Sequence, residues 1–269
     1  MNMVLRELRA NRKALIIWSV CMFLLVISGM AKYTAYTSAG AAGVSSINDL
    51  LKSMPTSIKA LLGFGSLDLA TMAGYFAMLF IYVELAVAIH AALLGAGIIA
   101  KEEDDKTTEY LMTKPVSRAA IITSKLLAAL FNVVVINVVT LVSFLVVIPL
   151  YNKANDISRE ILVMALSMFI VQLIFLSLGA ALAACMRNPK ASGSAATGIL
   201  LTAYFIGRIT DLSDKLRFLN LISPFKYFDL GRMAAGNGLN FGVVLLSLGL
   251  VATFCVLTYV FYQKRDLNI

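Results

Sequence analysis

Long apolar runs restrict the fold of this chain more than any other feature. Six such runs, separated by short charged segments, fill most of its 269 residues. A helix needs roughly 20 apolar residues to cross a hydrocarbon core about 30 Å thick. Backbone groups in lipid must be hydrogen-bonded within the structure, which leaves helices or closed barrels. The runs are too long and too continuously apolar for barrel strands, so the sequence predicts an all-α membrane protein with about six transmembrane helices.

Composition supports this fold class. Hydrophobic residues make up 60% of the chain and charged residues 14%, against roughly 25% charged residues in soluble domains. The formal net charge is +8, but the basic residues stand at the ends of apolar runs. This placement favours contact with a lipid membrane surface, and we expect no nucleic-acid partner. The three cysteines lie inside apolar runs and read as buried small residues rather than a disulfide framework.

We predict a single transmembrane domain over residues 1–269, with a short amphipathic segment at 3–13 that suits a helix in the headgroup region. Its basic side, with Arg6, Arg9 and Lys13, opposes an apolar side. A simple extension of the first span is the alternative. The predicted spans are 14–31, 71–100, 119–150, 161–186, 191–209 and 241–262.

Lysine and arginine near the span ends predict that both termini are cytoplasmic. Four basic residues precede the first span, whereas only Lys32 follows it closely. Over the whole chain the bias is weaker, because 13 of the 23 basic residues fall on the cytoplasmic side and 10 on the other. In this orientation 33–69, 151–160 and 210–240 face outward. The last is broken at Pro224 and carries too many apolar residues for a solvated loop, so we predict an extracellular re-entrant segment.

The cytoplasmic loop at 101–118, "KEEDDKTTEYLMTKPVSR", is densely charged. Glu102 and Lys106 form an i, i+4 pair that favours a helix, and Pro115 ends it. Tyr110 begins a short apolar patch beside the acidic turn. Charges with a few apolar anchors suit a protein-docking segment. A solvated loop that merely caps two spans is the alternative.

The stretch "AKEEDDKTTEYLMTKPVSRAAIITSK" resembles the signature of ABC-2-type permeases, the membrane-spanning subunits of ABC exporters. In that signature an acidic turn and a T-E-x-L run precede P-V-S-R and a lysine that enters the next span. The segments "LLKSMPTSIKALLGFG" and "LISPFKYFD" resemble the first and last external segments of that family. The resemblance implies an ABC-2-type (type V) exporter bundle in which 3–13 is an N-terminal elbow helix.

The resemblance also implies partners. A second permease subunit pairs with the chain as a homodimer or heterodimer, and an ABC ATPase subunit, in two copies, seats the cytoplasmic loop in a cleft. Arg118 would lie where the loop re-enters the membrane. The residues implied in ATPase coupling are Glu102, Glu103, Asp104, Lys106, Thr107, Thr108, Glu109 and Tyr110.

Nucleotide chemistry is not expected in this chain. The sequence has no G-x-x-x-x-G-K-[ST], the loop that cradles phosphates. We therefore expect ATP and Mg²⁺ to be bound by the partner ATPase, with no cofactor in this chain and no enzymatic activity of its own. Its single histidine also excludes a metal site of the H-E-x-x-H kind.

Two ionisable residues lie deep in the second apolar run. A charge at the bilayer centre costs about 2.5–3.5 kcal/mol on insertion scales, so Glu84 should face the bundle interior or a wet cavity. It either lines a translocation path or is a neutral residue bonded to a neighbouring helix. His90 lies about 240° further around the helix. It is the second candidate for the path, although a packing role is the more common one for such a histidine.

The function predicted from the resemblance is that of a permease subunit of an ATP-driven exporter in a bacterial plasma membrane. Its substrate would be a peptide, bacteriocins included, or another amphipathic molecule. A membrane enzyme is one alternative, disfavoured by the single histidine and the lack of paired intramembrane carboxylates. A non-transporting scaffold or sensor is the other, and it leaves the ordered family-like segments unexplained. Small-xxx-small pairs at Ala91–Gly95 and Gly179–Ala183 predict close helix contacts, within the monomer or at a dimer seam.

Overall fold

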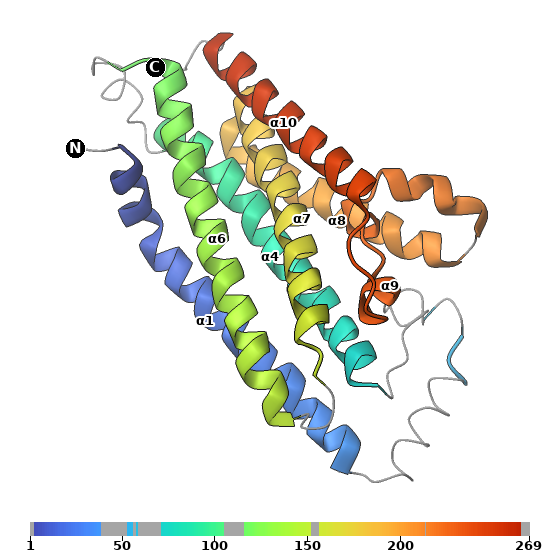
Figure 1. The fold of residues 1–269 in the computed structure, drawn as a ribbon. Coiled ribbons are helices and arrows are strands. Elements are labelled where there is room, and N and C mark those ends of the chain that lie inside the picture. Colours follow the sequence, from blue (N-terminus) through green and yellow to red (C-terminus); the bar gives the residue numbers. More distant parts are fainter. Residues whose placement is uncertain are drawn as a thin grey trace.

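The protein is a bundle of long helices in a computed structural model that describes residues 3–38, 53–55, 58, 71–104, 116–151, 156–212 and 214–264 (Figure 1). Helices are its only regular elements within these ranges, which confirms the all-α class. The long helices are α1 (Met3–Ser38), α4 (Met72–Asp104), α6 (Arg118–Tyr151), α7 (Ser158–Cys185), α8 (Ser192–Ile209) and α10 (Phe241–Lys264). The short elements are η1 (Pro189–Ala191), η2 (Thr210–Leu212), η3 (Asp214–Leu221), η4 (Pro224–Lys226) and α9 (Leu230–Ala234).

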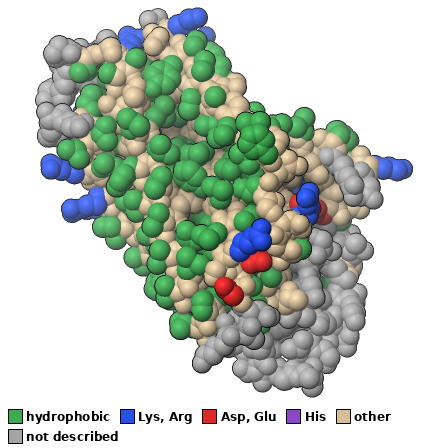
Figure 2. All heavy atoms as spheres, viewed as in Figure 1, with side chains coloured by type: hydrophobic (Ala, Val, Ile, Leu, Met, Phe, Trp, Pro, Cys, Tyr) green, Lys and Arg blue, Asp and Glu red, His purple; other side chains and the backbone are tan. Residues whose placement is uncertain are grey.

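Five of the described helices, α1, α4, α6, α7 and α10, are long and apolar enough to cross a membrane. Figure 2 shows a broad area of hydrophobic side chains on one face, with charged side chains away from its middle. The chain is therefore a multi-pass membrane protein. The predicted span 191–209 is a helix, α8, but it is not among the five. Its first half, "SGSAATG", is made of small and weakly polar residues.

The start of α1 and the end of α10 lie at the same end of the bundle (Figure 1). A chain that crosses the membrane an even number of times has its two ends on the same side. If α8 is the sixth membrane-spanning helix, it is the shortest of them. At 18 residues, α8 is about 27 Å long, slightly less than the hydrocarbon core. The number of membrane crossings and the side on which the termini lie stay predictions.

The N-terminal segment differs from the predicted division. Residues 3–13 and 14–31 are not two elements but parts of one continuous helix, α1. This is the alternative that the sequence pattern left open, an extension of the first span. The physical reason is that no proline or glycine interrupts the helix between the basic turns and the apolar run. The position of those turns at the membrane surface stays a prediction.

Helices α4 and α7 form the centre of the bundle, where small residues let their backbones touch. A Cβ atom on Gly95 would lie 2.0 Å from the carbonyl oxygen of Leu176, and one on Gly179 would lie 2.3 Å from that of Ala92. No side chain fits at such distances. Both small-residue pairs predicted from the sequence therefore serve packing within the monomer.

This contact gives a matched pair of substitutions on one helix. Gly95→Ala is expected to destabilise the bundle by about 1–3 kcal/mol, because the added methyl group must push two backbones apart. Gly97→Ala, where a Cβ meets nothing within 4 Å, is the control and should be neutral or slightly stabilising, as alanine favours helices. Thermal unfolding of the two purified variants in the same detergent measures the difference. Equal midpoints would contradict the close contact.

The predicted re-entrant segment 210–240 folds into short helices beside α8. Proline starts η4 at Pro224, and Phe225 packs against the rings of Phe175 and Tyr204 with centroids 5.2 and 5.5 Å away. In contrast, Phe218 on η3 is exposed. One part of the segment is thus anchored in the bundle while another presents apolar side chains outward. The predicted dip into the outer membrane interface stays a prediction.

Candidate functional site

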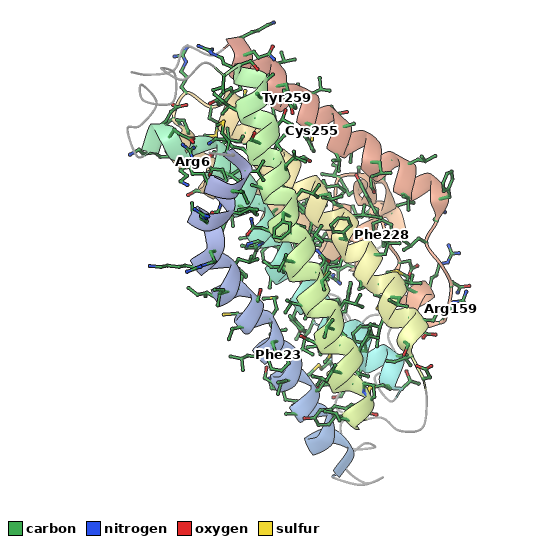
Figure 3. All side chains as sticks on the ribbon, turned by 60° about the vertical axis from the view of Figure 1, so that its left-hand side comes forward. Arg6, Phe23, Arg159, Phe228, Cys255 and Tyr259 are labelled. Carbon is green, nitrogen blue, oxygen red and sulfur yellow. The ribbon has the colours of Figure 1, made fainter. Side chains whose placement is uncertain are left out.

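Five charged residues from three helices meet at the end of the bundle where α1 starts, and we call them the charge cluster. Glu102 of α4 pairs with Lys125 of α6 and, at 3.0 Å, with Arg6 of α1. Glu7 pairs with Arg6 at 2.8 Å and with Lys101 at 3.3 Å. Figure 3 shows Arg6 on the first turns of α1, beside the end of α4. The cluster therefore joins the start of α1, the end of α4 and the start of α6.

The centre of the charge cluster lies inside the protein, while Arg6 and Lys101 at its edge are partly exposed. Glu7 and Lys125 are fully buried and Glu102 is 6% exposed. Lys125 also donates a hydrogen bond to the backbone carbonyl of Ile98. Buried charges persist only when they are paired and hydrogen-bonded, because desolvation costs several kcal/mol per ion. These buried ion pairs therefore hold the start of α1, the end of α4 and the start of α6 together, because water cannot reach the buried charges and replace their partners.

The predicted coupling residues divide into three groups. Glu102 is turned inward, so its carboxylate is used within the bundle and is not presented at the surface. Glu103 is half-buried, Asp104 ends α4, and Arg118 begins α6 and donates to the carbonyl oxygen of Gln263 at 3.0 Å. The other predicted coupling residues lie outside the described residues: Lys106, Thr107, Thr108, Glu109 and Tyr110.

The charge cluster contains one of the predicted elbow residues and two residues that were not predicted as site residues. Arg6 belongs to the charge cluster, whereas Arg9 and Lys13 are exposed. Sequence reasoning missed Glu7 and Lys125 as site residues. A signal existed for both: Glu7 is the single acidic residue among the four basic residues before the first apolar run, and Lys125 lies within an apolar run.

Deep in the bundle, α4 carries the two predicted intramembrane residues on different sides. Glu84 is 4% exposed. His90 packs its ring on Trp18 of α1, with centroids 5.0 Å apart. Its Nδ1 has no hydrogen-bond partner in the described part of the chain. The structure thus places His90 against α1, and no contact in the described part of the chain joins it to Glu84.

Arg208 is a third residue that sequence reasoning missed, although it is the only charged residue in 191–209. It is 5% exposed. Its guanidinium lies 5.0 Å from the ring centroid of Tyr204 and 3.8 Å from the carboxylate of Asp211. Asp211 in turn pairs with Lys226 of η4 at 2.5 Å. A chain of charges therefore runs from the inside of the bundle to its surface at the end of α8.

A further polar contact crosses the apolar interior between α6 and α7. Asn137 donates a hydrogen bond to Gln172 at 2.8 Å, and both residues are buried. Hydrogen bonds of this kind fix two membrane helices to each other. The contact positions α6, the helix that starts in the charge cluster, against the central helix α7.

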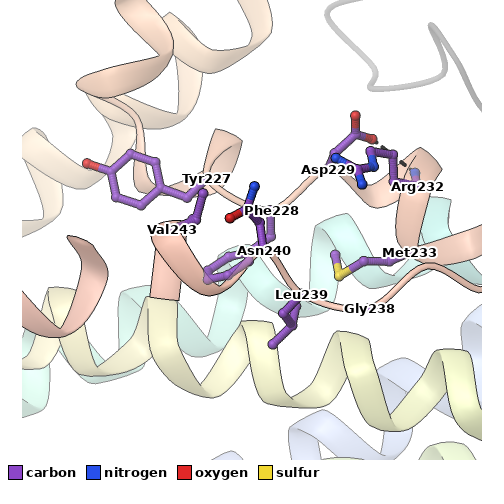
Figure 4. Close-up of a pocket in the computed structure, with 9 residues that line it drawn as sticks. All are labelled: Tyr227, Phe228, Asp229, Arg232, Met233, Gly238, Leu239, Asn240 and Val243. Atoms are coloured by element: carbon purple, nitrogen blue, oxygen red, sulfur yellow. Dashed lines mark hydrogen bonds between the residues drawn. The ribbon is translucent and has the colours of Figure 1, made fainter. Parts of the chain in front are cut away.

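A small pocket lies towards the other end of the bundle. A pocket of about 80 Å³ lies between α9 and the start of α10 (Figure 4). Asp229 at its rim caps α9 by accepting a hydrogen bond from the backbone N–H of Arg232 at 3.1 Å. A water needs roughly 10–15 Å³ of such space, so the pocket has room for a few waters and not for a peptide. The residues that line it are Tyr227, Phe228, Asp229, Arg232, Met233, Gly238, Leu239, Asn240 and Val243.

Comparison with known proteins identifies the family. The family model described as ABC-2 family transporter protein matches residues 1–267, which is nearly the whole chain. No curated protein matches the sequence. Among the described residues there is also no group of three histidine, cysteine or acidic side chains that could hold a metal ion. From the length of this match and the all-α membrane fold, we conclude that the chain belongs to the ABC-2 transporter family.

Proposed function

We propose that this chain is the permease subunit of an ATP-driven exporter and that the charge cluster couples it to a separate ATPase. Membership of the family makes the chain a permease component of an ABC transporter. Export, the two copies of the ATPase and a second permease subunit are the further parts of the proposal. The coupling step is supported by one observation: residues of the charge cluster lie on both sides of the segment 105–115, at the end of α4 and near the start of α6.

That segment joins the end of α4 to the start of α6. Glu102 lies in the last turn of α4 and Lys125 in the second turn of α6, and the two are paired. A force on the segment therefore reaches both helices at their paired ends, and Arg6 and Glu7 transmit it to α1. Packed interiors are not continuously deformable, so such helices shift as a unit between discrete arrangements.

The chemical energy would come from the partner. In this proposal ATP and Mg²⁺ are bound by the ATPase subunit, and closure of the ATPase pair moves the cytoplasmic segments. The charge cluster end is then the cytoplasmic end, with both termini on that side of a bacterial plasma membrane. The substrate proposed from the family resemblance is a peptide or another amphipathic molecule.

Co-purification from native membranes tests the proposal. The tagged chain is expected to retain an ATPase, identified by mass spectrometry. The double charge reversal Glu103→Lys with Glu109→Lys should lower the retained ATPase at least tenfold, because both are among the predicted coupling residues. Asp156→Lys, an exposed carboxylate beyond the other end of the bundle, is the control and should retain it fully. No ATPase with the wild-type chain, or equal retention by both variants, would refute the coupling role.

A further inference from the structure

We infer that the pocket between α9 and the start of α10 binds a phospholipid whose headgroup joins a phosphate to a primary ammonium group, as in phosphatidylethanolamine. The phosphate lies against Arg232 and the ammonium against Asp229, while the acyl chains follow α10 into the membrane. The inference goes beyond the proposed function, because it assigns a lipid site at the end of the bundle opposite the charge cluster.

The pocket lies where a membrane helix begins. Helix α10 is one of the five described helices that are long and apolar enough to cross a membrane, and it starts at Phe241. Val243, which lines the pocket, is two residues further, about 3 Å along the helix axis. Tyr227, of a residue type enriched at membrane–water interfaces, lines the pocket as well. The pocket is therefore at the level of lipid headgroups.

Two opposite charges line the pocket without pairing to each other. Asp229 and Arg232 are three positions apart, a spacing that allows an ion pair on a helix surface. Within the described ranges no ion pair joins their side chains, and no hydrogen bond reaches the guanidinium of Arg232. Asp229 uses Oδ1 to accept from the backbone N–H of Arg232 at 3.1 Å, and Oδ2 has no partner in the same ranges. Figure 4 shows both residues at one edge of the pocket, where a ligand finds one cationic and one anionic group.

The size and the walls of the pocket suit a small ammonium group. Its volume of about 80 Å³ corresponds to about five to eight water-sized groups, which accommodates an ammonium on a two-carbon linker. Phe228, which is 6% exposed, and Tyr227 contribute aromatic rings. Ring faces attract an ammonium, and a carboxylate accepts strong hydrogen bonds from its N–H groups. A headgroup with both charges matches Asp229 and Arg232 together, whereas a purely anionic headgroup is repelled by Asp229.

Apolar side chains continue from the pocket along α10. Leu246 and Leu250 follow Val243 at i+3 and i+7, on the same face of the helix. Leu246 is 41% exposed, and Val243 and Leu250 are half-buried. These three residues form a shallow apolar path that leads from the pocket into the membrane-spanning part of α10. Acyl chains cover such a path, so the structure favours a lipid over a soluble zwitterion with the same charged groups.

Lipid titration of the purified full chain in detergent, followed by native mass spectrometry, is the measurement. The unaltered chain should bind phosphatidylethanolamine at least fivefold more tightly than phosphatidylglycerol, which has the phosphate but no ammonium. Glycerophosphoethanolamine, the same headgroup without acyl chains, should bind at least a hundredfold more weakly than the lipid. These comparisons use no variant, so a folding defect cannot produce them.

Two substitutions should have different effects. Asp229→Asn keeps the cap of α9, because asparagine is as good an N-cap as aspartate, and should abolish the preference for phosphatidylethanolamine. Arg232→Gln removes the phosphate partner and should weaken the binding of both lipids at least fivefold. The control is Asp156→Asn with Arg159→Gln, an exposed carboxylate and arginine at the same spacing near the start of α7. It should leave both affinities unchanged.

The inference would be overturned by equal affinities for the two lipids in the unaltered chain, by a preference that survives Asp229→Asn, or by unchanged binding in Arg232→Gln. Glycerophosphoethanolamine binding as tight as that of the lipid would overturn the choice of a lipid and make the ligand a soluble zwitterion. The titration contains no ATPase. Its failure therefore leaves the co-purification result intact, and failure to retain an ATPase leaves the lipid site intact.

Discussion

Lys125→Met is expected to lower the free energy of unfolding by about 3–5 kcal/mol, the cost of leaving a buried charge without its partner. The substitution removes the buried amine that pairs with Glu102 and bonds to the carbonyl of Ile98. Because Glu102 is only 6% exposed, water cannot replace the lost counter-ion, and the partly exposed Arg6 is the ion-pair partner that remains among the described residues. Thermal unfolding of the purified chain in detergent measures the loss.

The double variant Glu102→Gln with Lys125→Met separates lost charge pairing from lost packing. With both charges gone, most of the stability should return, since replacing a buried ion pair by neutral groups is often close to neutral. Lys13→Met, an exposed change on α1, should stay within about 0.5 kcal/mol of wild type. A double variant less stable than Lys125→Met alone would contradict the account of the pair.

The same double variant is expected to uncouple transport from ATP hydrolysis. If the charge cluster passes motion from the segment 105–115 to α1 and α6, a folded bundle without its central ion pair should lose that link. The double variant should retain the ATPase and its basal hydrolysis, while ATP-dependent substrate movement into reconstituted vesicles falls at least tenfold. The control for a general loss of rigidity is the double variant Asn137→Ala with Gln172→Ala. It removes a buried hydrogen-bonded pair between α6 and α7 that lies outside the cluster.

Parallel losses of transport in the two double variants would mean that the cluster has no special part in coupling. Full transport by the cluster variant would show that the ion pair serves stability alone. The expected pattern is a selective loss, with ATPase retention unchanged in both proteins.

The sequence predicts most of this fold because lipid imposes one rule. Every span must satisfy its own backbone, so the apolar runs translate directly into helices. The rule does not set the ends of these helices. The basic turns before the first span continue into it as α1, since no proline or glycine stands where the polarity changes.

The sites were less predictable than the fold. The acidic turn at 101–118 was found from its charges, but no local pattern shows that Glu102 turns inward to meet Lys125, 23 residues later, and Arg6, 96 residues earlier. Arg208 is the only charged residue in 191–209, yet sequence reasoning missed it, and its contacts with Tyr204 and Asp211 are visible only in the folded end of α8. Contacts between distant segments are set by three-dimensional packing, which periodicity along one helix does not report.

Distances between spin labels in the complex with its ATPase test the central claim most directly. The labels are attached to cysteines introduced after the three native cysteines have been replaced. The first pair, Arg9→Cys with Ser117→Cys, spans the charge cluster from α1 to the start of α6. The second pair, Ser117→Cys with Asn188→Cys, runs from the start of α6 to the exposed turn before α8. On addition of a non-hydrolysable ATP analogue, the first distance should stay constant and the second should change. In the Glu102→Gln, Lys125→Met background the first distance should no longer stay constant. A first distance that changes as much as the second in the unaltered cluster would contradict the claim that α1, α4 and α6 move as one unit.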